Sequence, residues 1–258
     1  MTLCTLNVEN GVAIVTLQRP EAMNALSLAL LDEMDARLTE VEQREDIRCV
    51  VIAGAGTKAF CAGADLKERR TMSEEQAQNA VGRIRTVIER IAALEQPVIA
   101  AVAGVALGGG CELALACDVR VIAKDAVIGL TETRLAIIPG AGGTQRMARL
   151  IGPGRAKDLI LTGRRITGEE AFKLGMVERL TEAQEVLTTA VTLAQEMAQG
   201  GPIALRAAKA AIDHGLGRPL EEGLEIERRA YERVLHSQDR LEGLTAFAQK
   251  RAPRYEGR

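Results

Sequence analysis

The sequence predicts an α/β fold that continues into a helical C-terminal segment. Apolar runs of strand length alternate with helix-length periodic stretches up to about residue 180, and from residue 182 onward the pattern is helical throughout. At 258 residues, of which 47% are hydrophobic, the chain can bury one large core. No low-complexity stretch or linker separates the two parts, so we expect one continuous domain with a helical extension.

The N-terminal part predicts two strands, a helix and a third strand. Residues 3–8 and 12–17 alternate as strands do, and residues 9–11, Glu-Asn-Gly, form a good hairpin turn between them. Ser27 is suited to cap a helix whose apolar side chains recur at helical spacing. A short buried strand is expected at 49–53.

The next part predicts a loop, a long helix and a glycine-interrupted apolar stretch. Residues 54–67 are interpreted as a loop, after which Ser73 and Gln76 form a capping-box pattern before a helix that ends near Pro97. Residues 98–117 begin as an apolar strand, pass through three consecutive glycines and continue as a helix. Glu112 is the only charged residue in that stretch.

The remaining elements are assigned from the same periodicities and from turn and capping residues. They are strands at 119–123 and 127–129, helices at 143–151 and 154–162, a helix capped by Thr167 and closed by Gly175, a strand at 176–180, and helices at about 182–199, 202–216, 219–236 and 240–249.

The composition argues against several classes of protein. A net charge of −2 gives no overall field toward nucleic acid or membrane, and an aromatic content of 2% without tryptophan argues against stacking platforms for single strands. No apolar run is long enough to span a membrane, and the N-terminus shows neither a signal nor a transit pattern. We therefore expect a cytoplasmic protein.

The cysteine and histidine content argues against disulfide and metal chemistry. The five cysteines are odd in number and form no C-x-x-C pair, which is typical of reduced thiols. The only histidines, His214 and His236, fall in polar helical stretches. We expect no metal site, no histidine-based triad and no cofactor.

Three places in the chain could carry chemistry. Residues 62–65 open a helix after a loop, so their backbone N–H groups would be unpaired, although an ordinary helix start explains them equally well. Residues 108–112 offer glycine N–H groups at a helix N-terminus with Glu112 one turn away, or simply a tight strand-to-helix crossover. Glu132 lies in a polar break, where an acid is usually solvated. By contrast, Gly140 to Thr144 lacks the phosphate-loop spacing, and we interpret it as a turn into a helix.

Together the three places indicate a particular reaction. Two N–H donors from separate helix starts can hold a carbonyl oxygen as it becomes an enolate. Two carboxylates in one pocket differ in protonation, so one can take a proton from water while the other delivers a proton to carbon. This combination of two N–H donors and two carboxylates fits the addition of water across a double bond conjugated to a carbonyl.

Four segments, in this order along the chain, resemble the enoyl-CoA hydratase/isomerase (crotonase) family. They are residues 19–26 (RPEAMNAL), 59–67 (AFCAGADLK), 108–113 (GGGCEL) and 138–146 (IPGAGGTQR). The resemblance implies a crotonase-like spiral of ββα units over residues 1–195 and a helical trimerisation region over 196–258. It also implies an acyl-CoA thioester substrate and a homo-oligomer, either a trimer or a hexamer built as a dimer of trimers.

The resemblance also implies roles for individual residues. The backbone N–H groups of Ala64 and Gly109 match the oxyanion hole, Glu112 matches the glutamate that activates water for attack at C3, and Glu132 matches the glutamate that protonates C2. These roles imply syn hydration of a trans-2-enoyl-CoA to a 3-hydroxyacyl-CoA. Positions matching CoA-binding residues of the family are Ala22, Ala62, Asp65, Leu66 and Lys67, with Phe247 and Lys250 as candidates that reach a neighbouring subunit's CoA.

Two departures from the common hydratase pattern leave the substrate open. Thr131 stands where proline is common and Ala136 where glycine is, and the segment resembles the methylglutaconyl-CoA hydratase branch, which takes a branched substrate. Isomerase or decarboxylase activity is a second alternative, and a non-enzymatic RNA-binding protein on the same scaffold is a third. The helix at 74–94 has arginines but no lysine and carries three glutamates, which disfavours RNA binding.

Overall fold

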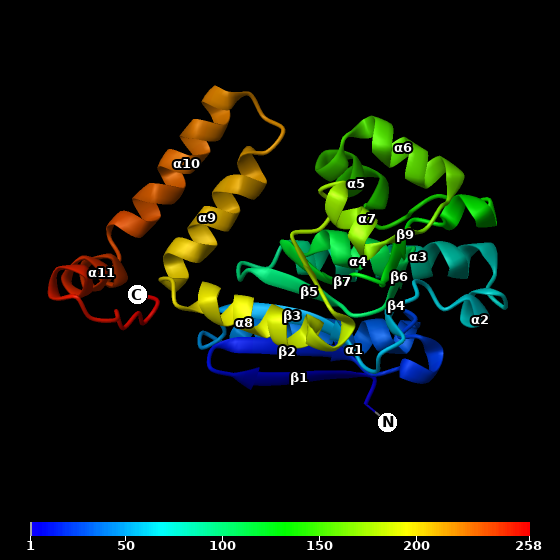
Figure 1. The fold of residues 1–258 in the computed structure, drawn as a ribbon, viewed down its shortest axis with the longest axis horizontal. Helices are drawn as coiled ribbons and strands as arrows, with labels where there is room; N and C mark the ends of the chain where they lie inside the picture. The colour runs from blue at the N-terminus through cyan, green and yellow to red at the C-terminus, as the bar shows by residue number, and fades with distance from the viewer. Residues whose placement is uncertain (1) are drawn as a thin grey trace.

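Strands form two sheets in the computed structural model, which describes residues 2–258 (Figure 1). The larger sheet has six strands in the order β1-β2-β3-β5-β7-β10, in which only β1 and β2 pair antiparallel. The smaller sheet has four strands in the order β4-β6-β8-β9, with β9 antiparallel to β8. The strands are β1 Cys4–Glu9, β2 Val12–Leu17, β3 Cys49–Gly54, β4 Ala59–Cys61, β5 Val98–Val102, β6 Val105–Leu107, β7 Val119–Ala123, β8 Val127–Gly129, β9 Ile166–Thr167 and β10 Arg179–Thr181.

The chain winds between the two sheets as a spiral. Three times in succession it adds a strand to the larger sheet, then a strand to the smaller sheet, and then one or more helices: β3 with β4, β5 with β6, and β7 with β8. This arrangement confirms the predicted spiral of ββα units. Because the turns are stacked, the strand-to-helix junctions of successive units lie near one another.

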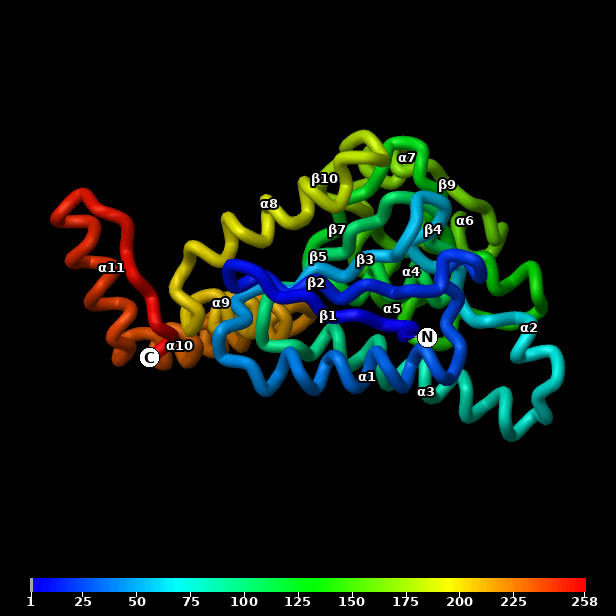
Figure 2. The backbone as a smooth tube through the Cα atoms, turned by 90° about the horizontal axis from the view of Figure 1, so that it is seen from below, coloured from blue at the N-terminus to red at the C-terminus, as the bar shows by residue number. Residues whose placement is uncertain are grey.

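Helices cover both faces of the larger sheet. Figure 2 shows α8 (Val186–Ala198) on one face and α1 (Leu28–Gln43) with α3 (Glu74–Ala92) on the other. The buried side chains of α1 recur at helical spacing, and β3 and β5 between the layers are almost wholly buried. The other helices are η1 Pro20–Ala22, α2 Leu66–Arg69, α4 Gly109–Ala116, η2 Glu132–Leu135, α5 Gly143–Ile151, α6 Pro153–Thr162, α7 Gly168–Lys173, η3 Ala183–Glu185, α9 Pro202–Gly215, α10 Leu220–Leu235 and α11 Gln238–Gln249.

The three predicted N-caps are confirmed, and at α7 the Thr167 hydroxyl accepts a hydrogen bond from the Glu170 N–H at 3.1 Å. The Ser27 hydroxyl accepts a hydrogen bond from the Leu30 N–H at 3.2 Å. Ser73 and Gln76 form the complete capping box, with Ser73 Oγ accepting from the Gln76 N–H at 3.2 Å and Gln76 Oε1 accepting from the Ser73 N–H at 2.8 Å. These bonds fix where α1 and α3 begin.

The sequence missed most of the smaller sheet. The predicted loop at 54–67 contains strand β4 and the start of α2, β6 is a separate strand inside the 98–117 stretch, and β9 had no predicted counterpart. The strand expected at 176–180 lies at Arg179–Thr181 instead. Strands of two or three residues are too short to show an alternating pattern, so their positions depend on pairing between distant segments.

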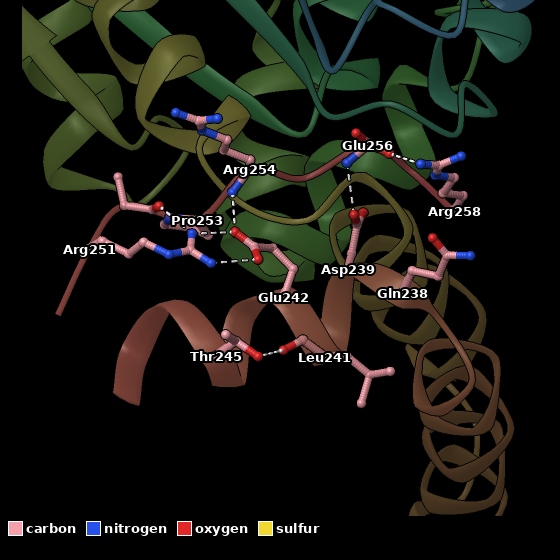
Figure 3. Close-up of a pocket in the computed structure, with 11 residues that line it drawn as sticks. Gln238, Asp239, Leu241, Glu242, Thr245, Arg251, Pro253, Arg254, Glu256 and Arg258 are labelled. Atoms are coloured by element: carbon pink, nitrogen blue, oxygen red, sulfur yellow. Dashed lines mark hydrogen bonds and ion pairs between the residues drawn. The ribbon is translucent and has the colours of Figure 1, made fainter. Parts of the chain in front are cut away.

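The C-terminal helices extend away from the sheets. Figure 1 shows α9 and α10 side by side, with α11 at the end of the molecule farthest from the smaller sheet. The chain then returns along α11, where Arg251 Nη1 donates to Glu242 at 2.6 Å and the Glu256 N–H donates to Asp239 at 2.7 Å (Figure 3). The predicted boundary between 195 and 196 falls in the last turn of α8, and the division into a core and an oligomerisation region stays a prediction.

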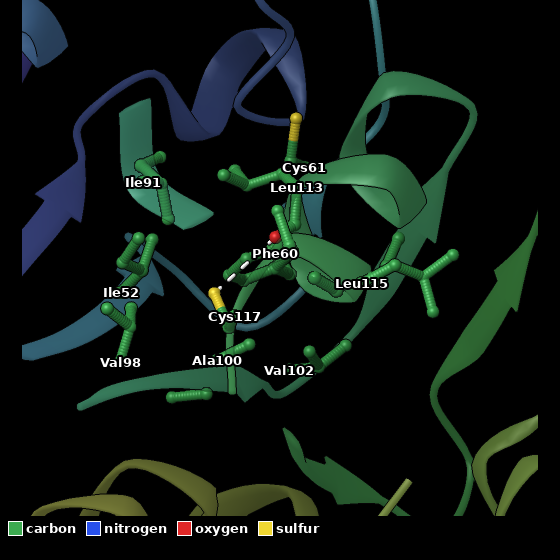
Figure 4. Packing of buried hydrophobic residues seen from close by; sticks show 14 of the residues in the cluster. Ile52, Phe60, Cys61, Ile91, Val98, Ala100, Val102, Leu113, Leu115 and Cys117 are labelled. Carbon is green, nitrogen blue, oxygen red and sulfur yellow. Dashed lines mark hydrogen bonds between the residues drawn. The ribbon is translucent and has the colours of Figure 1, made fainter. Parts of the chain in front are cut away.

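Helix α4 is packed into the core on every side. Phe60 and Leu113 are among the largest fully buried side chains, and the Cys117 thiol donates to the Leu113 carbonyl at 3.4 Å (Figure 4). All five cysteines are buried and form no disulfide, in line with the prediction of reduced thiols. Burial raises the pKa of Cys61 to about 12, so its thiol stays protonated at neutral pH. Among residues 2–258, no helix is both long enough and apolar enough to span a membrane.

Gly110 permits the contact that places the start of α4. A Cβ atom on Gly110 would lie 1.9 Å from the carbonyl oxygen of Cys61 in β4, so the helix can approach the smaller sheet only because this residue has no side chain. Gly82 on the exposed side of α3 is the opposite case, since a Cβ atom there would meet nothing within 4 Å.

We therefore expect opposite effects from two glycine-to-alanine substitutions. Gly110→Ala should lower the free energy of unfolding by about 3 kcal/mol or more, because α4 must move off the sheet. Gly82→Ala should raise it by about 0.5–1 kcal/mol, because alanine is the better helix former. Urea denaturation of both variants measures this, and equal effects of the two substitutions would contradict the packing described.

Candidate active site

A cavity of about 660 Å³ lies where the strand-to-helix junctions of the spiral meet. Its walls come from the start of α2, the first half of α3, the N-terminus of α4 and the segment from Thr131 to Ala141. Most of the lining is apolar, and its ionisable side chains are Arg69, Arg85, Glu112 and Glu132. An apolar cavity with a few convergent polar groups is typical of a small-molecule site.

Glu112 is buried in the first turn of α4 and held by two backbone donors. Glu112 is 3% exposed. Its Oε1 accepts hydrogen bonds from the N–H groups of Ala141 at 2.7 Å and Gly143 at 2.8 Å. Both bonds go to the same oxygen, so Oε2 has no hydrogen-bond partner among residues 2–258. The carboxylate is therefore fixed in orientation while one oxygen stays available to a ligand.

Glu132 reaches the same cavity from the other side of the α4 N-terminus. Its Oε1 would lie 3.3 Å from a Cβ atom built on Gly108, the residue before α4. Gly108 also has a φ of +52°, a backbone conformation that is strained for residues with a side chain. Glycine is therefore favoured here for two reasons, the positive φ and the space needed by Glu132. The backbone thus brings two carboxylates, from α4 and from η2, to one site.

The two carboxylates lie in different electrostatic surroundings. The pKa of Glu132 is raised to about 7, chiefly by burial and also by the negative charge of Glu112, although backbone hydrogen bonds and the charge of Arg69 act to lower it. The Oε2 atom of Glu132 is buried without a hydrogen-bond partner among the described residues. Near neutral pH, Glu132 can therefore hold a proton and donate it.

Two backbone N–H groups beside these carboxylates make no backbone hydrogen bond within residues 2–258. Leu26 bridges to Ala64 by donating to the Gly63 carbonyl at 2.8 Å and accepting from the Asp65 N–H at 3.1 Å, a pattern that leaves the Ala64 N–H unused. Gly109 is the first residue of α4, and its N–H likewise makes no backbone hydrogen bond within residues 2–258.

These two donors are close together. A Cβ atom built on Gly109 would lie 3.7 Å from the nitrogen of Ala64, and both residues line the cavity. The pair can polarise one carbonyl oxygen and stabilise negative charge on it.

The residues predicted to contact CoA are distributed unevenly. Ala62 and Leu66 line the cavity, whereas Lys67 and Ala22 are not part of its lining. Asp65 serves the fold, because its Oδ1 accepts from the Lys67 N–H at 3.1 Å and its Oδ2 pairs with Arg19 at 3.0 Å. Burial acts to raise the pKa of Asp65, but hydrogen bonds from Arg19 and from two backbone N–H groups outweigh it and keep this pKa below its ordinary value.

Phe247 and Lys250 lie far from the cavity within a single chain. Phe247 is on α11 and is 87% exposed, and Lys250 follows at the end of that helix, away from α2 and α4 (Figure 1). A contact of either residue with a ligand would therefore require a second chain, and their role stays a prediction.

The groups that orient Glu112 are not identified by the sequence patterns. Residues 140–144 were interpreted as a turn, yet their N–H groups hold Glu112. The sequence did contain one relevant signal: residues 140–144 form a glycine-rich helix start, whose backbone N–H groups are available to bind an anionic group. Arg69 was also missed, because one arginine in a charged segment gives no signal until the fold places it beside a cavity. Within the described chain, no group of three or more His, Cys, Asp and Glu side chains is arranged to hold a metal ion.

Comparison with known proteins gives a consistent result. The sequence profile of the family described as "Enoyl-CoA hydratase/isomerase" matches residues 7–258. The crystal structure of an enoyl-CoA hydratase from Bacillus anthracis superposes with a TM-score of 0.98 at 52% identity and covers 99% of this chain and 100% of that one. The mouse methylglutaconyl-CoA hydratase is 44% identical over 98% of this chain and 82% of its own length, and an enoyl-CoA isomerase/hydratase of Zymoseptoria tritici is 44% identical over 96% and 84%.

The raised pKa of Glu132 predicts a pH-dependent stability. Its folded pKa of about 7 lies above the ordinary 4.5, so the protonated form favours folding below about pH 4.5, and this contribution is lost as the pH rises through 7. Relative to wild type, Glu132→Gln should gain about 3 kcal/mol of unfolding free energy between pH 4.5 and 8, since each pKa unit corresponds to about 1.4 kcal/mol. Denaturation of both proteins across this range tests it; parallel pH curves would contradict the assigned environment.

Proposed function

The chain belongs to the enoyl-CoA hydratase/isomerase family, and on that premise we propose that it is an enoyl-CoA hydratase. The reaction is the syn addition of water to a trans-2-enoyl-CoA thioester, which gives a 3-hydroxyacyl-CoA. One observation carries the proposal: Glu112 and Glu132 line a single apolar cavity beside the unused N–H groups of Ala64 and Gly109. Hydration needs a base that takes a proton from water and an acid that gives a proton to carbon. The carboxylate of Glu112 can act as the base, and the protonated Glu132 can act as the acid.

The geometry supports a simple sequence of bond changes. The thioester oxygen accepts hydrogen bonds from the N–H groups of Ala64 and Gly109, which draws electrons away from C3. The Glu112 carboxylate takes one proton from water as the water oxygen bonds to C3, and the double-bond electrons move into an enolate. Glu132 then gives its proton to C2, and the thioester carbonyl re-forms. Glu112 ends protonated and Glu132 ionised, so one proton returns between them through solvent before the next turnover.

Isomerase and branched-substrate hydratase activities are the competing readings. An isomerase moves one proton between two carbons and needs no activated water, so the second, firmly oriented carboxylate of Glu112 supports hydration. Product analysis separates an isomerase from a hydratase, because only hydration yields a 3-hydroxyacyl-CoA. A hydratase for a branched substrate is separated by comparing rates on straight and branched enoyl-CoA thioesters. Binding of RNA through α3 has little support, since Arg83 is paired with Asp32 at 2.9 Å and Arg90 with Glu42 at 2.6 Å.

We further propose that the chain works as a homo-oligomer. The helices α9 to α11 carry large apolar side chains that are more than half exposed in the single chain, and burial of such a surface favours association. Light scattering of the purified protein distinguishes a trimer or a hexamer from a monomer. The exposed side chains in question are Ile212, Leu216, Leu220, Leu224, Tyr231, Leu241, Leu244 and Phe247.

The two glutamates give the most direct test of the reaction. Glu112→Gln and Glu132→Gln should each lower kcat for crotonyl-CoA hydration by about 10²- to 10⁴-fold, because each removes one proton-transfer group. Loss of the conjugated-enoyl absorbance measures the rate, and calorimetry should show that both variants still bind the thioester. Glu89→Gln on the exposed face of α3 is the matched control. Wild-type turnover in either active-site variant would refute the assigned roles.

A further inference from the structure

The segment from residue 138 to residue 141 lines the cavity but is held by no regular structure. It belongs to no helix or strand, and its backbone groups make no hydrogen bond to another backbone group within residues 2–258. Yet the Ala141 N–H is one of the two donors to the buried Glu112 carboxylate, at 2.7 Å. A donor on such a segment can keep a carboxylate in one orientation only if something else anchors the segment.

Arg85 of α3 supplies such an anchor. Its Nε donates to the Gly140 carbonyl at 2.9 Å. This carbonyl and the Ala141 N–H belong to the same planar peptide group, so Arg85 and Glu112 hold opposite ends of one peptide unit. Hydrogen bonds in a chain polarise one another, and a cation at the carbonyl end therefore makes the N–H at the other end a stronger donor.

A second arginine holds the next carbonyl of the same segment. Arg146 donates from Nη1 to the Ala141 carbonyl at 2.9 Å. Arg146 lies in α5, the helix that directly follows, so its contact is local. The contact of Arg85 joins residues that are 55 positions apart in the sequence, and it alone of the two ties the segment to α3.

Gly140 makes this anchor necessary. A Cβ atom at this position would lie 2.7 Å from Cγ1 of Val81, so the close approach to α3 favours glycine. Glycine, however, restricts the rotation of the following peptide group very little. If that group turned over, its carbonyl oxygen would face Glu112 in place of the N–H, and a hydrogen bond would become a repulsion. The bond from Arg85 to the carbonyl opposes this rotation.

We propose that Arg85 is a positioning residue for hydration: by holding the Gly140 carbonyl, it keeps the Ala141 N–H directed at Glu112 and the carboxylate aligned with the attacking water. This inference rests on the proposed hydratase function and adds a residue to it. Arg85 acts on the reacting atoms only through one peptide group and Glu112, so its loss disturbs the alignment of the base and leaves substrate binding in place.

The first test separates kcat from KM for crotonyl-CoA hydration. Arg85→Met should lower kcat by about 10- to 100-fold, as for a misplaced catalytic group, and change KM less than about threefold. Arg85→Lys keeps a cationic donor and should restore most of kcat.

Arg83→Met is the matched control, because Arg83 lies on the same helix but pairs with Asp32 and Asp35 of α1. It should leave both kinetic parameters as in wild type. A higher KM with normal kcat in Arg85→Met would overturn the inference and assign Arg85 to ligand binding. Equal losses of kcat in the Arg85 and Arg83 variants would overturn it in favour of a general packing role of α3, and normal kinetics in Arg85→Met would overturn it outright.

A double variant tests whether Arg85 acts through Glu112. In the Glu112→Gln background, Arg85→Met should lower kcat less than about threefold further, because the two substitutions disable one and the same group. Losses that multiply in the double variant would show an independent role of Arg85 and overturn the inference.

A crystal structure of Arg85→Met separates this inference from the proposed function. Loss of the 2.7 Å contact between the Ala141 nitrogen and Glu112 Oε1 supports the positioning role even if wild type hydrates no enoyl-CoA, an outcome that would refute only the hydratase proposal. The same contact retained in the variant would overturn the inference and leave the hydratase proposal standing.

Discussion

The structure of the site depends on the burial of Glu112 against two backbone N–H groups. A carboxylate removed from water is strongly destabilising unless hydrogen bonds replace its hydration, and the donors at Ala141 and Gly143 supply that replacement. The same bonds tie the first turn of α4 to the segment that precedes α5, two parts of the chain about thirty residues apart. Glycines at 108 and 110 allow α4 to start where these bonds can form, and the two N–H groups beside it are then left unused.

The cavity combines groups that the fold itself leaves unsatisfied. Glu132 Oε2 and Arg69 Nε are buried without partners, and the N–H groups of Ala64 and Gly109 take part in no backbone hydrogen bond within residues 2–258. A buried polar group without a partner is destabilising, and a polar group of a ligand bound in the cavity would supply the missing partner. Unsatisfied polar groups lower the folding stability of the protein, and such groups are common at sites that bind a ligand.

The sequence predicted the parts of the fold that are encoded locally. Periodicity located α1 and α3, and hydroxyl and amide side chains at Ser27, Ser73 and Gln76 marked where these helices begin. The short strands β4, β6 and β9 escaped detection because each pairs with a segment 22 to 46 residues away in the sequence. Family resemblance pointed to Ala64 and Gly109, whose proposed roles depend on backbone N–H groups and cannot be inferred from their side chains. Arg69 and the donors to Glu112 became visible only in three dimensions.

The central claim is that two N–H groups polarise the thioester carbonyl of a bound acyl-CoA. Isotope-edited infrared difference spectroscopy of crotonyl-CoA carrying a ¹³C label at the thioester carbon reports on this bond directly. Bound to the protein, the carbonyl stretch should fall below its value in water, and the shift should persist in Glu132→Gln because backbone donors cause it. An unshifted carbonyl band in a saturated complex would contradict the account.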